Sequence, residues 1–331
     1  MENYHGRKED TVFDSDLNVT ITPAIQENMT EIDREFVENV ALSVSELSSL
    51  AEELATYLVE LLSLELSPMD GLLAMRENVE ALLLDGEGSE ESFPHTVRAA
   101  YHSIKENERA IFIRLLLEKL SKKGIALSEE DFLQIGESAP VFAYVKNTLA
   151  DEAYDVITEN IPDAKVRYVP SFTEAVRLLL NGDVGFCLLP IEEKGELRLP
   201  TVENLLFSEQ LKIRRIVPVF GFDGLADLKY ALVSRSAYIE PYQREDDRYL
   251  EIHIPQREGD FSLSAFLFAL SLGGMQLYRI HTVSIDRAGE REDYLSLVLK
   301  SQGESFIPLL SYLALFCERY TVVGIYKNLE Y

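Results

Sequence analysis

The stretch GFCLLPIEEKGELRLPTVENLL, residues 185–206, passes from an apolar run into a charged, glycine-containing loop and then into a second apolar segment that opens at Thr201. The run VGFCLL at 184–189 is almost continuously apolar, which is typical of a strand covered by helices on both faces. Strands and helices alternate around it, with strands at 141–145 and 164–169 and helices at 149–161 and 171–180. This alternation predicts a parallel α/β sheet, and ligands of such sheets bind beyond the carboxyl ends of the strands, where PIEEKG lies.

Two further strands are predicted at 211–220 and 228–234, and the charged segment 240–248 is predicted to be a linker. After it the pattern reads strand, helix, strand, strand, helix, strand. Their ranges are 249–255, 261–272, 275–285, 294–299, 304–317 and 320–326. This βαββαβ order predicts a ferredoxin-like module.

The N-terminal third has a different composition. Residues 1–131 hold 28 Asp and Glu against 11 Lys and Arg. Apolar residues recur near the helical period, which predicts helices at 31–66, 68–84 and 95–122, the last ending at Gly124. Ser128 is an expected N-cap for a short fourth helix, whereas 1–30 is polar and aperiodic and is expected to be a mobile tail. The fold class is therefore α/β and α+β behind an acidic helical domain.

The formal net charge of −26 argues against nucleic acid and anionic membranes as partners, because phosphates would be repelled. No apolar run reaches the length of a membrane span, and the N-terminus lacks a secretory apolar core. Two lone cysteines make no disulfide framework, so a cytoplasmic location is expected. The five histidines show no ligand spacing, and we expect no metal and no cofactor.

The order of these segments resembles the prephenate dehydratase family, over about 140–331. PSFTEAVRLLLNGDVGFCLLPIEEKGELRLPTVENLL is similar to the family stretch that carries Pro-Ile-Glu-Asn-Ser, and YVKNTLADEAYDVI is similar to its opening. The resemblance implies a periplasmic-binding-protein-like catalytic domain followed by an ACT regulatory domain. The predicted domains are a tail at 1–30, the acidic helical domain at 31–136, an α/β lobe at 137–239 and an ACT-like domain at 248–331.

The resemblance also implies site residues. Glu192 matches the family Glu and Thr148 the family Thr, while Glu193 and Lys194 replace Asn and Ser. Thr201 matches a family Thr only with small gaps. Without the family's glycines before it, Thr148 is equally interpreted as a helix N-cap, and Glu192 to Glu196 as a solvated loop.

The family's Thr-Arg-Phe motif aligns best with Leu228, Lys229 and Tyr230, which removes the catalytic hydroxyl because leucine transfers no proton. A slipped register places Ser234 and Arg235 on the motif instead and keeps both functional groups. If the chain were active, Ser234, Lys229 and Glu192 would be its catalytic residues. The tentative ligand-binding residues are Thr148, Glu192, Lys194, Thr201, Lys229 and Arg235.

The largest departure from the family is length. About 22 residues separate Leu211 from Val233, whereas an independent α/β lobe needs at least ~50. One lobe is therefore expected to be missing, which leaves the site open to water. The ACT phenylalanine-binding motifs are not intact, and Gly273 and Gly274 are interpreted as a helix C-cap turn. Chorismate mutase activity is not expected, because the first long helix has only one basic residue, Arg34.

Three hypotheses follow. The first is a non-catalytic, prephenate dehydratase-like regulatory or small-ligand-binding protein linked to aromatic amino acid metabolism, whose ligand would be a small aromatic acid or amino acid. The second is a divergent prephenate dehydratase whose second half comes from another subunit. The third is an interaction protein that works through its acidic helical domain. We expect a homodimer through the ACT-like domain, because unpaired sheet edges need a partner, with residues 31–135 packed on or near the α/β lobe.

Overall fold

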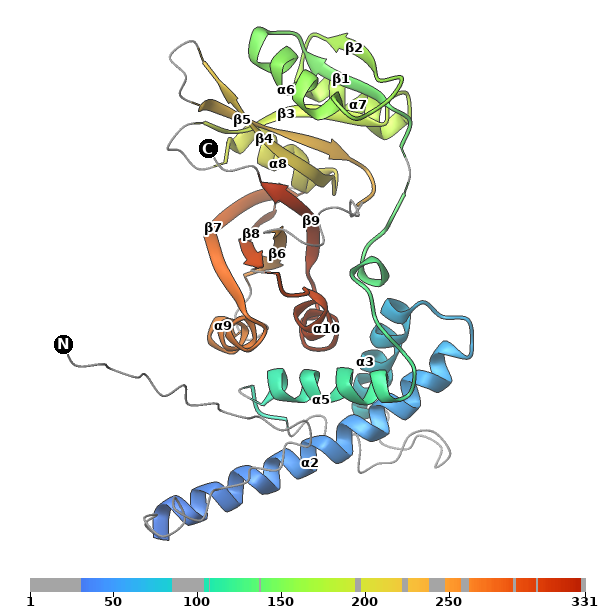
Figure 1. The fold of residues 1–331 in the computed structure, drawn as a ribbon, viewed down its shortest axis with the longest axis vertical. Helices are drawn as coiled ribbons and strands as arrows, with labels where there is room; N and C mark the ends of the chain where they lie inside the picture. The colour runs from blue at the N-terminus through green and yellow to red at the C-terminus, as the bar shows by residue number, and fades with distance from the viewer. Residues whose placement is uncertain are drawn as a thin grey trace, which may run out of the picture.

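A computed structural model describes ten segments of the chain, namely 31–84, 104–106, 108–136, 138–193, 198–221, 226–237, 248–256, 262–287, 290–301 and 303–328. The tail predicted at 1–30 and the loop predicted at 86–94 lie outside these residues, as does most of the linker predicted at 240–248. In Figure 1 the described residues form three tiers: an α/β part, a C-terminal sheet with the helices α9 (Leu263–Leu272) and α10 (Ile307–Phe316), and a helical part. No helix in the described segments is long and apolar enough to cross a membrane.

The helical part is built as the apolar spacing predicts. Its elements are α2 (Glu31–Leu62), α3 (Pro68–Leu84), α5 (Arg109–Lys122) and the short 3-10 helix η1 (Glu129–Phe132). Leu50, Leu54 and Leu58 are buried along one face of α2. Gly124 ends α5 with a left-handed backbone, φ 83°, and the Ile125 N–H donates to the Leu120 carbonyl oxygen at 3.0 Å.

The helix predicted at 95–122 is too long at its start. Residues 95–103 are not described, and 104–106 are not helical. The Lys105 N–H donates to the Glu108 side chain at 3.1 Å, and the Glu108 N–H donates to the Lys105 carbonyl oxygen at 2.8 Å. This local turn satisfies the backbone groups in place of a helical turn, so α5 begins at Arg109.

The α/β part holds five strands and three helices. They are β1 (Val141–Val145), α6 (Thr148–Thr158), β2 (Lys165–Val169), α7 (Phe172–Asn181), β3 (Phe186–Glu193), α8 (Pro200–Ser208), β4 (Lys212–Phe220) and β5 (Ala226–Ser234). As predicted, β1, β2 and β3 are parallel, while β5 runs antiparallel to both β3 and β4. The apolar strand was predicted to end at 189, but β3 continues through Glu193 because β5 pairs with it along PIEE.

The C-terminal part has the predicted βαββαβ order. Its elements are β6 (Arg248–Pro255), α9 (Leu263–Leu272), β7 (Met275–Arg287), β8 (Glu290–Ser301), α10 (Ile307–Phe316) and β9 (Thr321–Asn328). The strands lie in the order β9-β6-β8-β7, and β6 pairs antiparallel with both β8 and β9. Residues 248–254 of β6 are all buried, because one face of this sheet packs on helices and the other meets the α/β part.

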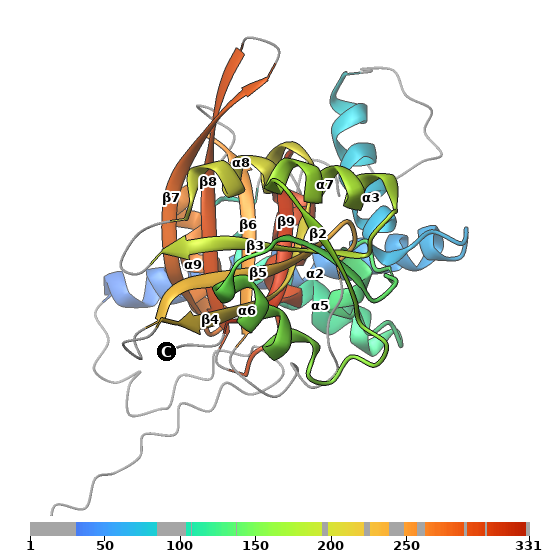
Figure 2. The same ribbon diagram turned by 90° about the horizontal axis from the view of Figure 1, so that it is seen from above.

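The strands of the α/β part and those of the C-terminal part form one continuous sheet. Arg215 and Ile216 of β4 pair parallel with Lys327 and Asn328 of β9, which gives one nine-stranded sheet in the order β2-β1-β3-β5-β4-β9-β6-β8-β7. Seen from above, β3 and β5 run across the direction of β6 and β8 (Figure 2). The sheet thus folds one half over the other, and polar side chains meet between the two faces.

The helical part packs mainly on the C-terminal part, whereas the sequence predicted packing on or near the α/β lobe. Helices α3 and α5 contact α10, and α5 also contacts α9 (Figure 1). Leu54 and Phe112 share one core with Leu310 and Leu313 of α10. The physical reason is the composition of α10, IPLLSYLALF, which is apolar on all sides and needs cover both from its own sheet and from the helices beyond it.

Candidate functional site

Glu192 and Lys229, two of the predicted site residues, lie opposite each other. They are register partners on β3 and β5, and Lys229 Nζ lies 3.4 Å from Glu192 Oε2. Both side chains are buried, with 6% of Glu192 and 4% of Lys229 exposed. The structure therefore brings together the carboxylate and the cation that the family pattern indicates, but it removes them from solvent.

Ser234 does not join them. It lies five positions along β5 from Lys229, roughly 16 Å at the rise of a strand. Its hydroxyl donates to the Ser236 carbonyl oxygen at 2.6 Å and accepts a hydrogen bond from Arg214 Nε at 2.7 Å. Arg235 is exposed and donates to the Leu180 carbonyl oxygen at 3.3 Å. The slipped register therefore does not assemble a hydroxyl, a cation and Glu192 in one place.

The remaining predicted residues are peripheral. Thr148 is exposed and is the first residue of α6, and the N-cap is Asn147, whose Oδ1 accepts from the Ala150 N–H at 2.8 Å. This corrects the interpretation of Thr148 as the cap. Thr201 is exposed in the first turn of α8, a helix that the sequence analysis did not predict. Lys194 lies outside the described residues.

The C-terminal part closes the site over Glu192. Arg279 on β7 forms an ion pair with Glu192 Oε1, so each oxygen of this carboxylate faces a cation. Burial alone would raise the pKa of Glu192, but the charges of Arg198, Arg279 and Lys229 outweigh it and hold the pKa below its usual value. A carboxylate in this state accepts hydrogen bonds and is a poor general acid.

Arg198 forms the second half of the cluster. It is placed by a short backbone bridge to Glu192 and is 4% exposed. Its Nη2 donates to Glu251 Oε2 on β6 and, at 3.0 Å, to the Tyr326 hydroxyl on β9, while that hydroxyl donates to Glu251 at 2.5 Å. Burial, followed by the charge of Glu251, raises the pKa of Tyr326. The three residues form a closed, charge-assisted network.

Two histidines continue the cluster. His281 Nε2 lies 2.6 Å from Glu203 Oε1 on α8, and His253 Nε2 lies 3.9 Å from Glu251 Oε1. Burial lowers the pKa of His253 to about 4, so its ring is neutral at pH 7. Among the described residues, no group of three or more His, Cys, Asp or Glu side chains could hold a metal ion.

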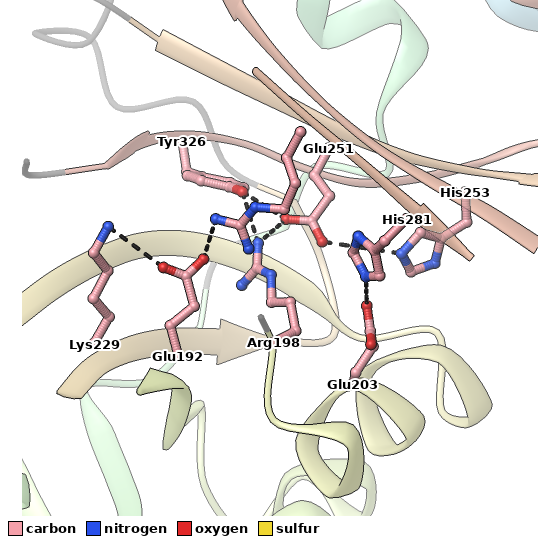
Figure 3. Close-up of polar contacts among 9 residues, drawn as sticks. Glu192, Arg198, Glu203, Lys229, Glu251, His253, His281 and Tyr326 are labelled. Atoms are coloured by element: carbon pink, nitrogen blue, oxygen red, sulfur yellow. Dashed lines mark hydrogen bonds and ion pairs between the residues drawn. The ribbon is translucent and has the colours of Figure 1, made fainter. Parts of the chain in front are cut away.

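These residues form an interface cluster between the folded halves of the sheet (Figure 3). Its members are Glu192, Arg198, Glu203, Lys229, Glu251, His253, Arg279, His281 and Tyr326. Among these members, three carboxylates meet three permanent cations, so the described part of the cluster has no cation in excess for a dicarboxylate ligand. Arg198 Nη1 and Arg279 Nη1 are buried without a hydrogen-bond partner among the described residues, and we expect ordered water to satisfy them.

The C-terminal members of this cluster were not predicted from the sequence. Glu251 carried a signal, because it stands in the otherwise apolar run YLEIHIP, where a buried charge requires a partner. Arg198 and Arg279 carried none, since a single cation between two apolar residues is also what a solvent-facing position looks like. The missing lobe led to the prediction of a site open to water on one side. That prediction is wrong, because the C-terminal sheet covers Glu192.

No protein-family model matches this sequence, and no curated protein matches it. Among solved structures it is similar to a prephenate dehydratase from Streptococcus mutans, at 15% identity and a TM-score of 0.41 over 57% of this chain and 99% of that one. It is similar to the prephenate dehydratase from Arthrobacter aurescens, solved with L-Phe, at 11% identity and a TM-score of 0.41 over 56% and 89%. It is also similar to GqqA, described as a novel type of quorum quenching acylase, at 17% identity and a TM-score of 0.40 over 56% and 94%.

Proposed function

We propose that this chain is a non-catalytic, prephenate dehydratase-like protein that binds a small ligand and acts in regulation. One observation carries the proposal: Glu192 is neutralised by Lys229 and Arg279 under the C-terminal sheet. A substrate carboxylate at this place would have to displace an internal carboxylate from the buried Lys229 and the partly buried Arg279. Breaking a buried pair costs about 3–5 kcal/mol, which a small acid does not recover from one salt bridge.

The chemistry of the neighbouring strand supports the same proposal. Leu228 stands where the family pattern has its threonine, and it pairs with Glu193 at the edge of the cluster. A leucine side chain can neither donate nor accept a proton. Ser234, the alternative hydroxyl, is fully buried and engaged by Arg214. The second hypothesis, a divergent prephenate dehydratase, therefore lacks a positioned acid at Leu228 and at Ser234, the two positions that the family pattern indicates.

The test is a direct assay of the purified full chain with prephenate. We expect phenylpyruvate to form only at the spontaneous rate, and Lys229→Met to change nothing. Phenylpyruvate production above that rate, lost in Lys229→Met or in Ser234→Ala, would overturn the proposal and favour the dehydratase. Arg177→Gln serves as the matched control, because Arg177 lies on the exposed side of α7 in a pair with Glu174.

The homodimer expected from the sequence stays a proposal. Strand β7 forms one edge of the sheet, and Tyr278 and Ile280 on it are 43% and 40% exposed. Phe268 and Leu272 on the adjoining α9 are 40% and 46% exposed. Pairing two such edges about a two-fold axis would cover these apolar side chains. Light scattering of the full chain at tens of micromolar tests this, and a monomeric mass would contradict it.

A further inference from the structure

A cavity of about 550 Å³ lies where the three parts of the chain meet. Its wall combines residues of α3 and η1, the turn from α8 into β4, and the segment from α10 into β9, together with β6 and β8. The volume falls within the range of small-molecule sites. It adjoins the interface cluster, with which it shares His253, but it is lined by none of the other members of that cluster.

One wall of the cavity is aromatic. The Phe207 ring stacks on His253 with centroids 5.1 Å apart and meets Tyr294 edge-on at 4.3 Å. His253 is uncharged at neutral pH because burial lowers its pKa. Phe132 and Tyr320 add two more rings to the lining. Flat apolar surfaces of this kind favour a ring-sized or branched apolar group in contact with them.

Three cationic side chains also line the cavity. Lys212, Arg76 and Arg319 line the cavity against one carboxylate, Glu318, in a chain whose formal net charge is −26. Lys212 Nζ donates to the Val322 carbonyl oxygen at 2.5 Å and keeps further donors. Arg319 lies at the rim with 45% of its side chain exposed, and its Nη1 lies 3.8 Å from Glu292 Oε1. Among the described lining residues, cations therefore outnumber carboxylates at this cavity, although Arg76 already donates to the Ala314 and Cys317 carbonyl oxygens.

We infer that this cavity binds a small organic monocarboxylate with an apolar, ring-sized body. The body would pack on Phe207 and Tyr294, and the carboxylate would accept hydrogen bonds from Lys212 and Arg319. Glu318 disfavours a second negative charge on the ligand. The inference rests on the proposed function in one respect, that the ligand is held and not converted.

Such a ligand would touch the helical part, the α/β part and the C-terminal part together. Binding to the assembled cavity stabilises the folded chain by mass action, because the cavity exists only when the three parts are docked. Ligand binding would therefore depend on the docking of the helical part and would stabilise the docked state. That is the regulatory consequence of its position.

The test compares two probes of equal shape, phenylacetate and the uncharged phenylacetamide. Saturation-transfer NMR and calorimetry on the full chain should show one phenylacetate per chain. Phenylacetamide should bind roughly tenfold more weakly, because a charge-assisted contact contributes more than a neutral one. Equal affinity of the two probes would overturn the inference, and so would the absence of phenylacetate binding at about 10 mM, where weak ligands still occupy their sites.

Variants localise the binding. Lys212→Met and Arg319→Gln should each weaken the binding of phenylacetate by roughly five- to tenfold. Lys165→Met and Arg167→Gln are the same changes on exposed β2 and should leave this binding unchanged. Gln134 is an exposed residue of the cavity rim, so Gln134→Glu should weaken the anionic probe roughly threefold without affecting folding. Unchanged affinity in all three cavity variants would place binding elsewhere and overturn the inference.

The two proposals fail separately. Phenylpyruvate formed from prephenate would overturn the non-catalytic role even if phenylacetate binds at the cavity. If phenylacetate does not bind the unsubstituted chain, the cavity site is overturned even if no prephenate is converted. Circular dichroism of each variant, with unchanged unfolding, ensures that lost binding is not lost folding.

Discussion

The carboxylate of Glu192, on β3 of the α/β part, forms a buried ion pair with the guanidinium of Arg279, on β7 of the C-terminal part. This pair crosses the interface between the two halves of the folded sheet. Lys229 holds the other oxygen of the same carboxylate. Glu192 is therefore a structural anchor for the two halves, and its removal should be measurable as lost stability.

Arg279→Met should lower the free energy of unfolding by about 3 kcal/mol, because Glu192 is left buried with an unpaired oxygen. Urea unfolding monitored by tyrosine fluorescence measures this. The double variant Glu192→Gln/Arg279→Met should lose less than the sum of the two single variants, since the pair is coupled. The control Arg177→Gln, on an exposed pair, should leave stability unchanged; additive losses would contradict the pairing.

Tyr326→Phe removes the hydroxyl that donates to Glu251 and accepts from Arg198. Both partners are buried, so the change leaves a charged acceptor short of a donor and should cost about 1–3 kcal/mol. Tyr278→Phe is the matched control, because Tyr278 is 43% exposed. Equal stability of Tyr326→Phe and the unsubstituted chain would mean that water replaces the hydroxyl at no cost.

His253 should make the protein less stable in mild acid. Its pKa is lowered from 6.5 to about 4, mainly by burial and against the charges of Glu251 and Glu203. Between these two pH values the unfolded chain binds a proton that the folded chain does not, so stability falls as pH falls. The loss from this group between pH 7 and 5 is about 2 kcal/mol.

The check compares urea unfolding at pH 7 and pH 5 for the unsubstituted chain and for His253→Phe. The variant should lose less stability over that interval. Glu192 affects stability at lower pH, because its pKa is depressed below the ordinary value of 4.5. Its contribution to stability is present above pH 4.5 and is lost as the pH falls below that value. An identical pH dependence in the variant and the unsubstituted chain would show that His253 is not the titrating group.

Gly324→Ala should separate β9 from β4. A Cβ at Gly324 would lie 2.2 Å from the Ile213 carbonyl oxygen, which is backbone and cannot move aside. The expected cost is about 1–3 kcal/mol, with faster amide hydrogen exchange along β9. Gly124→Ala, where nothing lies within 4 Å of the added Cβ but the positive φ of 83° strains an alanine, should destabilise only the end of α5 and leave exchange on β9 unchanged.

Much of the fold was predictable because its signals are local. The capping pair Ser171 and Glu174 begins α7, Ser67 and Pro68 separate α2 from α3, and Gly124 ends α5. Strand positions followed from apolar runs. Helix α8 was missed, because Pro200 opens it without a side-chain cap and it follows a charged loop.

The site was predictable only in its α/β half. Glu192 and Lys229 were predicted from the resemblance to the family pattern, but Arg279 and Tyr326 reach the same point through the folding of one half of the sheet over the other. That relation depends on the pairing of β4 with β9 at two register positions, which no local pattern encodes. The docking of the helical part on α10 is long-range in the same way.

The position of β9 also sets an order of events during synthesis. β9 is the last of the described strands to be made, yet it pairs with both β4 and β6. Until it emerges from the ribosome, β4 has an open edge and β6 lacks one neighbour, and open edges favour association with other chains. The sheet of the nascent α/β part is therefore incomplete until residues 221–328 have been made, and slow translation of this stretch leaves the β4 edge exposed to other chains.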